Sequence, residues 1–132
     1  MDALIKRLKK HEGFKGYPYS CPTGHLTIGY GHKLPILEKQ AAAILVDDIY
    51  YVSNQYMAWK GRNRLKLTLV RDEVLVEMIF WHGFDGFLSF KRMIQAIKDG
   101  DYDKAADEMM DSESGRKYKM RMYELSGMMR DG

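Results

Sequence analysis

The chain has 132 residues, of which 45% are hydrophobic, and its 21 lysines and arginines against 18 aspartates and glutamates give a formal charge of +3. This composition is typical of one ordinary folded domain and argues against a disordered chain. The positive excess is too small to indicate nucleic acid as a partner, and no apolar run is long enough to span a membrane. The single cysteine, Cys21, excludes an internal disulfide and a four-cysteine zinc site. We expect no metal and no cofactor.

Apolar residues at positions 4, 5 and 8, interleaved with lysines and an arginine, predict a short amphipathic helix over residues 3–12 that Gly13 ends. Glu12 lies four residues beyond Leu8, so a straight helix places its carboxyl group on the apolar stripe. Loss of water there would favour the protonated carboxyl, which is the form that a general acid needs. The simpler interpretation is an exposed glutamate at the end of a helix.

Glycines and prolines crowd the start of residues 13–33, and strict alternation follows. The pattern predicts a small antiparallel sheet with a turn at residues 21–24. One strand face would carry Leu26, Ile28 and Tyr30, and the other Thr27, Gly29 and Gly31. We expect the first face to pack on protein and the second to leave room for a ligand ring near the backbone. Glycines in strands also mark bulges or close packing, which is the alternative.

Helical periodicity follows the predicted sheet almost to the end of the chain. Gly83 and Gly100 are the expected ends of two of the helices, and Asp101 is the expected cap of a third. The predicted helices cover residues 38–57, 70–81, 87–98, 101–110 and 118–129, and residues 60–66 are predicted to be a basic loop. Strands followed by a run of helices indicate the α+β class.

Cys21 opens the predicted turn, with His25 and His32 close to it in the sequence. An ordinary thiol has a pKa of about 8.5 and is mostly protonated at neutral pH unless a cation assists. These residues could form the site of a cysteine-histidine peptidase, with Cys21 and either His25 or His32, or a metal site with all three as ligands. Neither is favoured, because Cys21 lies in a turn before a strand and the spacings match no standard zinc pattern.

Residues 12–32, EGFKGYPYSCPTGHLTIGYGH, resemble the active-site signature of phage-type lysozymes of the T4 lysozyme family, glycoside hydrolase family 24. That signature is a glutamate, an aspartate or cysteine after eight further residues, and a threonine after five more. Glu12, Cys21 and Thr27 fit both spacings. The later segments VEMIFWHGF, FKRMIQAIKDGDYDKAADEMM and RMYELSGMMRDG also resemble the family's helices.

The resemblance implies one lysozyme-like domain over residues 1–132, with two lobes. The N-terminal lobe would span about residues 13–58 and hold the sheet, and the helical lobe would span about residues 59–132 together with helix 1–12. The implied fold is α+β and mostly helical.

The resemblance also implies a muramidase, which cuts the β-1,4 bond between N-acetylmuramic acid and N-acetylglucosamine in peptidoglycan. Glu12 would be the general acid, and Thr27 would hold the attacking water or the sugar. Cys21 occupies the place of the second, usually acidic, catalytic residue, and its role as base, nucleophile or placeholder stays open. His32 matches a family histidine expected to be structural and paired with an acidic group, and with Gly29 and Gly31 it belongs to the expected substrate-facing strand.

Many members carry an asparagine or glutamine where this chain has Phe80, Trp81 and His82. We expect Phe80 and Trp81 to contact substrate, with Trp81 as a stacking surface; the alternative for Trp81 is a core aromatic.

Such an endolysin would act on peptidoglycan as a monomer. The N-terminus lacks the apolar segment and cleavage site of a signal peptide, so we expect the host bacterial cytoplasm as its location until a separate membrane-permeabilising partner releases it. The alternative function is a weak or inactive lysozyme-fold domain that binds peptidoglycan or a protein partner.

Overall fold

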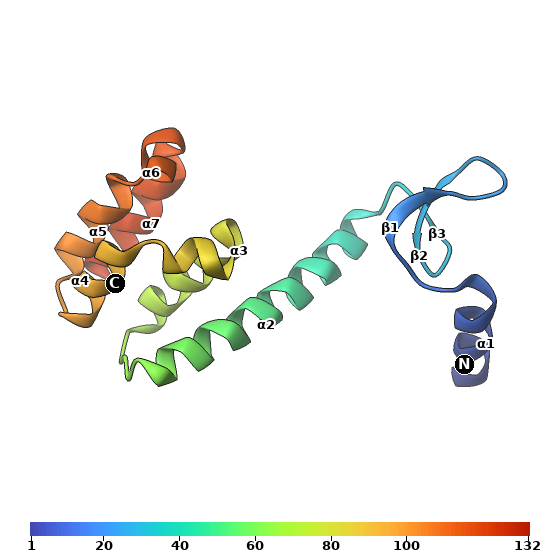
Figure 1. Cartoon of the computed structure of the whole chain (residues 1–132), viewed down its shortest axis with the longest axis horizontal. Helices are drawn as coiled ribbons and strands as arrows, with labels where there is room; N and C mark the ends of the chain where they lie inside the picture. Colours follow the sequence, from blue (N-terminus) through green and yellow to red (C-terminus); the bar gives the residue numbers. More distant parts are fainter. The chain divides into compact units, whose positions relative to one another are not determined.

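The computed structural model describes every residue from Met1 to Gly132 and contains seven helices and three strands, labelled in Figure 1. The class is α+β and mostly helical, as the sequence predicted. Contacts divide the chain into two compact units, residues 1–44 and residues 45–132. These boundaries differ from the lobes that the resemblance implied, which stay a prediction.

The N-terminal unit begins with α1 (Asp2–Glu12), which is followed by a three-stranded antiparallel sheet in the order β1 (Lys15–Ser20), β2 (Leu26–Gly29) and β3 (His32–Lys33). β1 is an edge strand and contains Pro18, which has no N–H group for the ladder. Its pairing with β2 is correspondingly irregular between Lys15 and Tyr19. The predicted turn is confirmed, because the Gly24 N–H donates to the Cys21 carbonyl over 2.8 Å and Gly24 has a φ of +81°.

The expected orientation of the β2 strand faces was wrong. Thr27, placed on the open face, is only 1% exposed, whereas Leu26 and Tyr30, placed on the packed face, are 51% and 46% exposed. Thr27 is enclosed because it pairs with Tyr19 of β1 and with Lys33 of β3, in the middle of the small sheet. The alternation also stops early, since β2 ends at Gly29, where φ is +69°.

The C-terminal unit consists of helices (Figure 1). The first of them, α2, begins at Glu38 in the N-terminal unit and continues past its last residue, Ile44. Their bounds are α2 (Glu38–Arg62), α3 (Leu69–Leu88), α4 (Lys91–Lys98), α5 (Tyr102–Met110), α6 (Glu113–Lys117) and α7 (Lys119–Asp131). The core surrounds Leu75, Met78 and Ile79 of α3, which are all but inaccessible to solvent. Methionines of α5 and α7 complete it, since a flexible thioether side chain fills irregular gaps. No helix combines the length with the apolar character needed to cross a bilayer.

Several helix boundaries differ from the sequence prediction. The helix expected to stop at Gly83 continues to Leu88 as α3, with a kink at Gly83, where φ is +74°. Residues 60–62, expected in a basic loop, continue α2, because Trp59 is buried and Lys60 pairs with Asp72 of α3 over 2.8 Å. The helix expected from residue 87 begins at Lys91, because Ser89 turns its hydroxyl onto the Gly86 carbonyl and interrupts the helix there. The short α6, which the sequence did not predict, is capped by Ser112.

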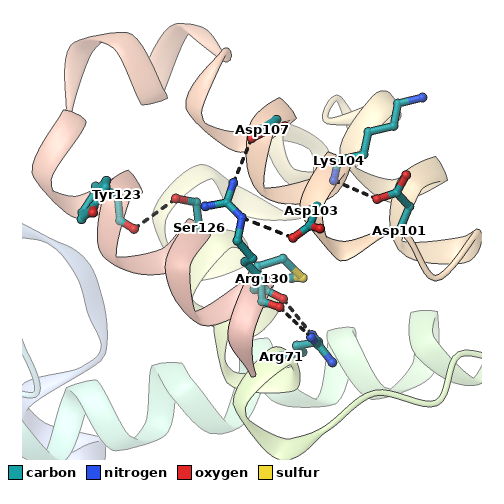
Figure 2. Close-up of polar contacts among 9 residues, drawn as sticks. Arg71, Asp101, Asp103, Lys104, Asp107, Tyr123, Ser126 and Arg130 are labelled. Atoms are coloured by element: carbon teal, nitrogen blue, oxygen red, sulfur yellow. Dashed lines mark hydrogen bonds and ion pairs between the residues drawn. The ribbon is translucent and has the colours of Figure 1, made fainter.

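Charged side chains fasten α7 to α3 and α5 within the C-terminal unit (Figure 2). Arg71 of α3 donates from Nε to the Met129 carbonyl over 2.8 Å and from its terminal nitrogen to the Arg130 carbonyl over 3.0 Å. These carbonyls lie at the end of α7, where they have no partner within the helix. The Arg130 side chain pairs with Asp103 at 3.4 Å and Asp107 at 2.9 Å, both on α5.

Candidate active site

Glu12 is the last residue of α1, and Gly13, with a φ of +70°, turns the chain out of the helix. Its carboxyl group lies directly over the backbone of Gly31, in the loop between β2 and β3. A Cβ atom added to Gly31 would lie 2.8 Å from Oε2 of Glu12, and Gly31 has a φ of +77°. Glu12 itself is exposed. The expected loss of water around its carboxyl is therefore not found, and the simpler interpretation of its position holds.

Cys21 begins a chain of three side chains joined by hydrogen bonds. Its Sγ lies 3.0 Å from Oγ1 of Thr23, and that oxygen lies 2.9 Å from Nδ1 of His25. The hydrogen bond with Thr23 is the main cause that lowers the pKa of the Cys21 thiol to about 6. The Thr23 hydroxyl thus contributes most to making the thiolate accessible near neutral pH. The His25 ring is linked to the sulfur only through Thr23, and no cluster of His, Cys, Asp and Glu fit for a metal ion is formed.

Thr27 and Cys21 are connected through one backbone oxygen. The Thr27 hydroxyl donates to the His25 carbonyl over 2.9 Å, and the Cys21 N–H donates to the same carbonyl over 2.9 Å. The Thr27 hydroxyl is thereby fixed in direction, with its proton on the His25 carbonyl. Two of the three signature residues therefore share one hydrogen-bonded loop.

His32 lies in β3 opposite Ile28 of β2. Its Nε2 atom is shielded from solvent and has no hydrogen-bond partner within the protein, so the expected pairing with an acidic group is absent. The ring lines a cavity of about 440 Å³ in the N-terminal unit, together with Ile28, Gly29 and residues of α2. Gly29 and His32 thus border the same cavity.

Phe80 and Trp81 belong to the C-terminal unit. Phe80 is exposed and lines a groove of about 600 Å³ between α2 and α3. Trp81 is half-buried against the core, and the Arg121 guanidinium lies 4.3 Å from its ring centre. One face of the indole is thereby occupied, so a sugar that stacked there would have to displace Arg121.

Residues 9–129 match the family model of phage lysozyme, and this range contains Glu12, Cys21 and Thr27. The chain belongs to the phage lysozyme family. An endolysin of Acyrthosiphon pisum secondary endosymbiont phage 1 is 28% identical over 109 residues, which cover 78% of this chain and 72% of that relative. The resemblance inferred from the sequence motif is confirmed, and the protein is a glycoside hydrolase of the lysozyme type.

Two features of this lysozyme's site were not predicted from the sequence. One is Thr23, which holds the Cys21 sulfur; its place two residues after Cys21 in a tight turn is the signal that was available. The other is the contact between Gly31 and Glu12, which joins residues far apart in the motif and has no local signature.

Proposed function

We propose that the protein is an endolysin that acts as a muramidase. It hydrolyses the β-1,4 bond between N-acetylmuramic acid and N-acetylglucosamine in bacterial peptidoglycan. The observation that carries the proposal is the arrangement of the signature within the N-terminal unit. Glu12 lies on Gly31, and Cys21 and Thr27 meet at the His25 carbonyl.

Glu12 is the proposed general acid, which gives its proton to the glycosidic oxygen as the bond breaks. Hydrolysis of a glycoside ordinarily needs a second, negatively charged group, which activates water or forms a bond with the sugar. Cys21 stands in that place. Thr27 was expected to hold the attacking water or the sugar. Because it is buried and its hydroxyl donates to the His25 carbonyl, its proposed part is instead to fix the loop that carries Cys21.

Gly29, Gly31 and His32 are the proposed substrate contacts of the sheet, and Phe80 and Trp81 those of the helical unit. Peptidoglycan is the proposed partner, and the protein acts on it as a monomer. We place it in the host bacterial cytoplasm until its release to the cell wall. The charge of +3 assists its approach to an anionic polymer.

The test is loss of turbidity of purified peptidoglycan, with wild-type protein and Glu12→Gln. Glutamine keeps the shape of the side chain and cannot donate the proton, so the rate should fall by about 100-fold or more. Glu38→Gln, a change at an exposed glutamate in the first turn of α2, is the matched control and should keep the wild-type rate.

A second outcome would favour the binding function instead. If wild-type protein and Glu12→Gln are equally inert but both sediment with the polymer, the domain binds peptidoglycan without cutting it. Equal, rapid clearing by both proteins would contradict the role of Glu12 as the acid.

A further inference from the structure

The hydrogen-bonded side chains belong to alternate residues of one turn, namely Cys21, Thr23 and His25. Thr23 and His25 are both exposed, so neither contributes to a core. The backbone also fixes the turn without these side chains, through the bond from Gly24 N–H to the Cys21 carbonyl and the bond from Cys21 N–H to the His25 carbonyl. The structural need for a hydroxyl at position 23 is therefore small, and its contact with the sulfur calls for another explanation.

We propose that Thr23 and His25 are positioning residues that hold Cys21 as a thiolate, so that a thiol supplies the negative charge of the second catalytic group. The inference rests on the proposed function. This role would explain the hydrogen bonds of the turn, because an ordinary thiol is mostly neutral at pH 7 and a neutral group cannot replace a carboxylate.

The hydrogen-bonded side chains of Cys21, Thr23 and His25, here called the relay, can hold the same number of protons in two arrangements. In the thiol form, the Cys21 S–H donates to Thr23 Oγ1, and the Thr23 hydroxyl donates to an unprotonated Nδ1 of His25. In the thiolate form, Nδ1–H donates to Thr23 Oγ1, and the Thr23 hydroxyl donates to the sulfur. The passage from the first to the second moves one proton from sulfur to Thr23 and one from Thr23 to His25, so that the sulfur becomes a thiolate, the His25 ring becomes an imidazolium and the net charge is unchanged. No other reactant is needed.

The surroundings of the sulfur agree with the thiolate form. The hydrogen bonds that lower the pKa of the Cys21 thiol most come from the Thr23 hydroxyl and from the backbone at positions 25 and 23. None of these bonds comes from a charged side chain, and His25 is the titratable group that reaches the sulfur through Thr23. The hydrogen bond with Thr23 has the largest effect and outweighs partial desolvation, which acts in the opposite direction.

The first experiment measures the rate of alkylation of Cys21 by iodoacetamide against pH in the full chain. Only the thiolate reacts, and the chain has one cysteine, so the midpoint reports this thiol alone. Wild-type protein should show a midpoint near pH 6. Thr23→Val should raise it by about one to two pH units, the effect expected when a hydrogen bond to an anion is lost. Thr23→Ser keeps the hydroxyl and should restore the wild-type midpoint.

His25→Ala should raise the midpoint by less than Thr23→Val, since the Thr23 hydroxyl can still donate to the sulfur. A midpoint that does not respond to Thr23→Val, or a wild-type midpoint near the ordinary value of about 8.5, would overturn the proposal. A midpoint unchanged by His25→Ala would remove His25 from the relay.

The second experiment places the relay in the reaction. Thr23→Val should reduce clearing of peptidoglycan at pH 6 to 7 by about tenfold, with recovery at higher pH as the thiol ionises unaided. In a Cys21→Asp background the same change should have little effect, because an aspartate is ionised without help. An equal loss in both backgrounds would contradict an action through the thiol. The alkylation result does not depend on lysis, so failure of the proposed function and failure of the relay are distinguished.

Discussion

Gly31 determines where the Glu12 carboxyl group lies. Its φ of +77° belongs to the left-handed region that favours glycine, and the missing side chain leaves the space that Oε2 of Glu12 fills. Gly29 has a similar φ of +69°, but a Cβ atom there would meet nothing within 4 Å. The two glycines therefore share the same backbone requirement, and only one of them touches the proposed acid.

Alanine at each position separates these two effects. Gly29→Ala and Gly31→Ala should both lose about 1–2 kcal/mol of unfolding free energy, because each places a side chain at positive φ. Gly31→Ala should also lose about 100-fold in lytic activity, because it displaces the Glu12 carboxyl from its position. Gly29→Ala, which leaves that carboxyl in place, should lose much less. Urea unfolding and clearing of peptidoglycan measure the two quantities. An equal loss of activity in both variants would show that strain of the loop, and not the contact with Glu12, is responsible.

The family could be predicted from residue types at fixed spacings along the chain. Glu12, Cys21 and Thr27 were selected in this way, and their roles stay predictions. The burial of Thr27 and the absence of a partner for His32 Nε2 depend on which strands lie on either side, and alternation within one strand does not contain that information.

The junction of α2 and α3 depends on a small polar cluster around Asp72. The buried Tyr56 donates its hydroxyl to Asp72, and Lys60 pairs with the same carboxylate at 2.8 Å. Burial, assisted by the Asp72 charge, raises the pKa of the Tyr56 hydroxyl, so it remains a donor at every ordinary pH. The Asp72 carboxylate thus provides the polar partner of two α2 side chains, the Tyr56 hydroxyl and the Lys60 ammonium group.

Asp72→Ala should lower the free energy of unfolding by about 2–3 kcal/mol, since it leaves a buried hydroxyl and a largely buried ammonium group without their partner. Asp103→Ala is the matched control. It also removes an aspartate from the first turn of a helix and from a pair with a cation, but Asp103 is 82% exposed against 20% for Asp72. Asp103→Ala should lower the free energy of unfolding by less than about 1 kcal/mol. Equal losses in urea unfolding would contradict the importance of burial at this junction.

Helix ends illustrate what local sequence determines and what it does not. Gly13 and Gly100 were predicted to end helices, and each lies just beyond the end of one with a positive φ. Gly83 was predicted to end a helix as well, but it only kinks α3, which continues to Leu88. Asp101 was predicted as a cap, and its carboxylate accepts from the Lys104 N–H. The end of α2 was missed because Asp72, ten residues beyond it in the sequence, holds Lys60 in the helix. A contact of this kind cannot be read from a window of neighbouring residues.

Burial is distributed very unequally along the whole chain. Every buried apolar side chain belongs to residues 45–132, whereas Thr27 is the single buried residue of the N-terminal unit. The signature residues therefore lie in the unit that is held mainly by backbone hydrogen bonds and turns. Average composition predicted one folded domain but gave no sign of this division, because it does not record where the apolar residues are buried.

The central claim is that this protein hydrolyses the β-1,4 bond that follows N-acetylmuramic acid in peptidoglycan, with Glu12 as the general acid. The most direct measurement is to digest purified peptidoglycan, reduce the new sugar ends with borohydride and identify them by mass spectrometry. Wild-type protein should produce reduced N-acetylmuramic acid, and Glu12→Gln should produce none. Reduced N-acetylglucosamine, 1,6-anhydro ends or an undiminished yield from Glu12→Gln would contradict the account.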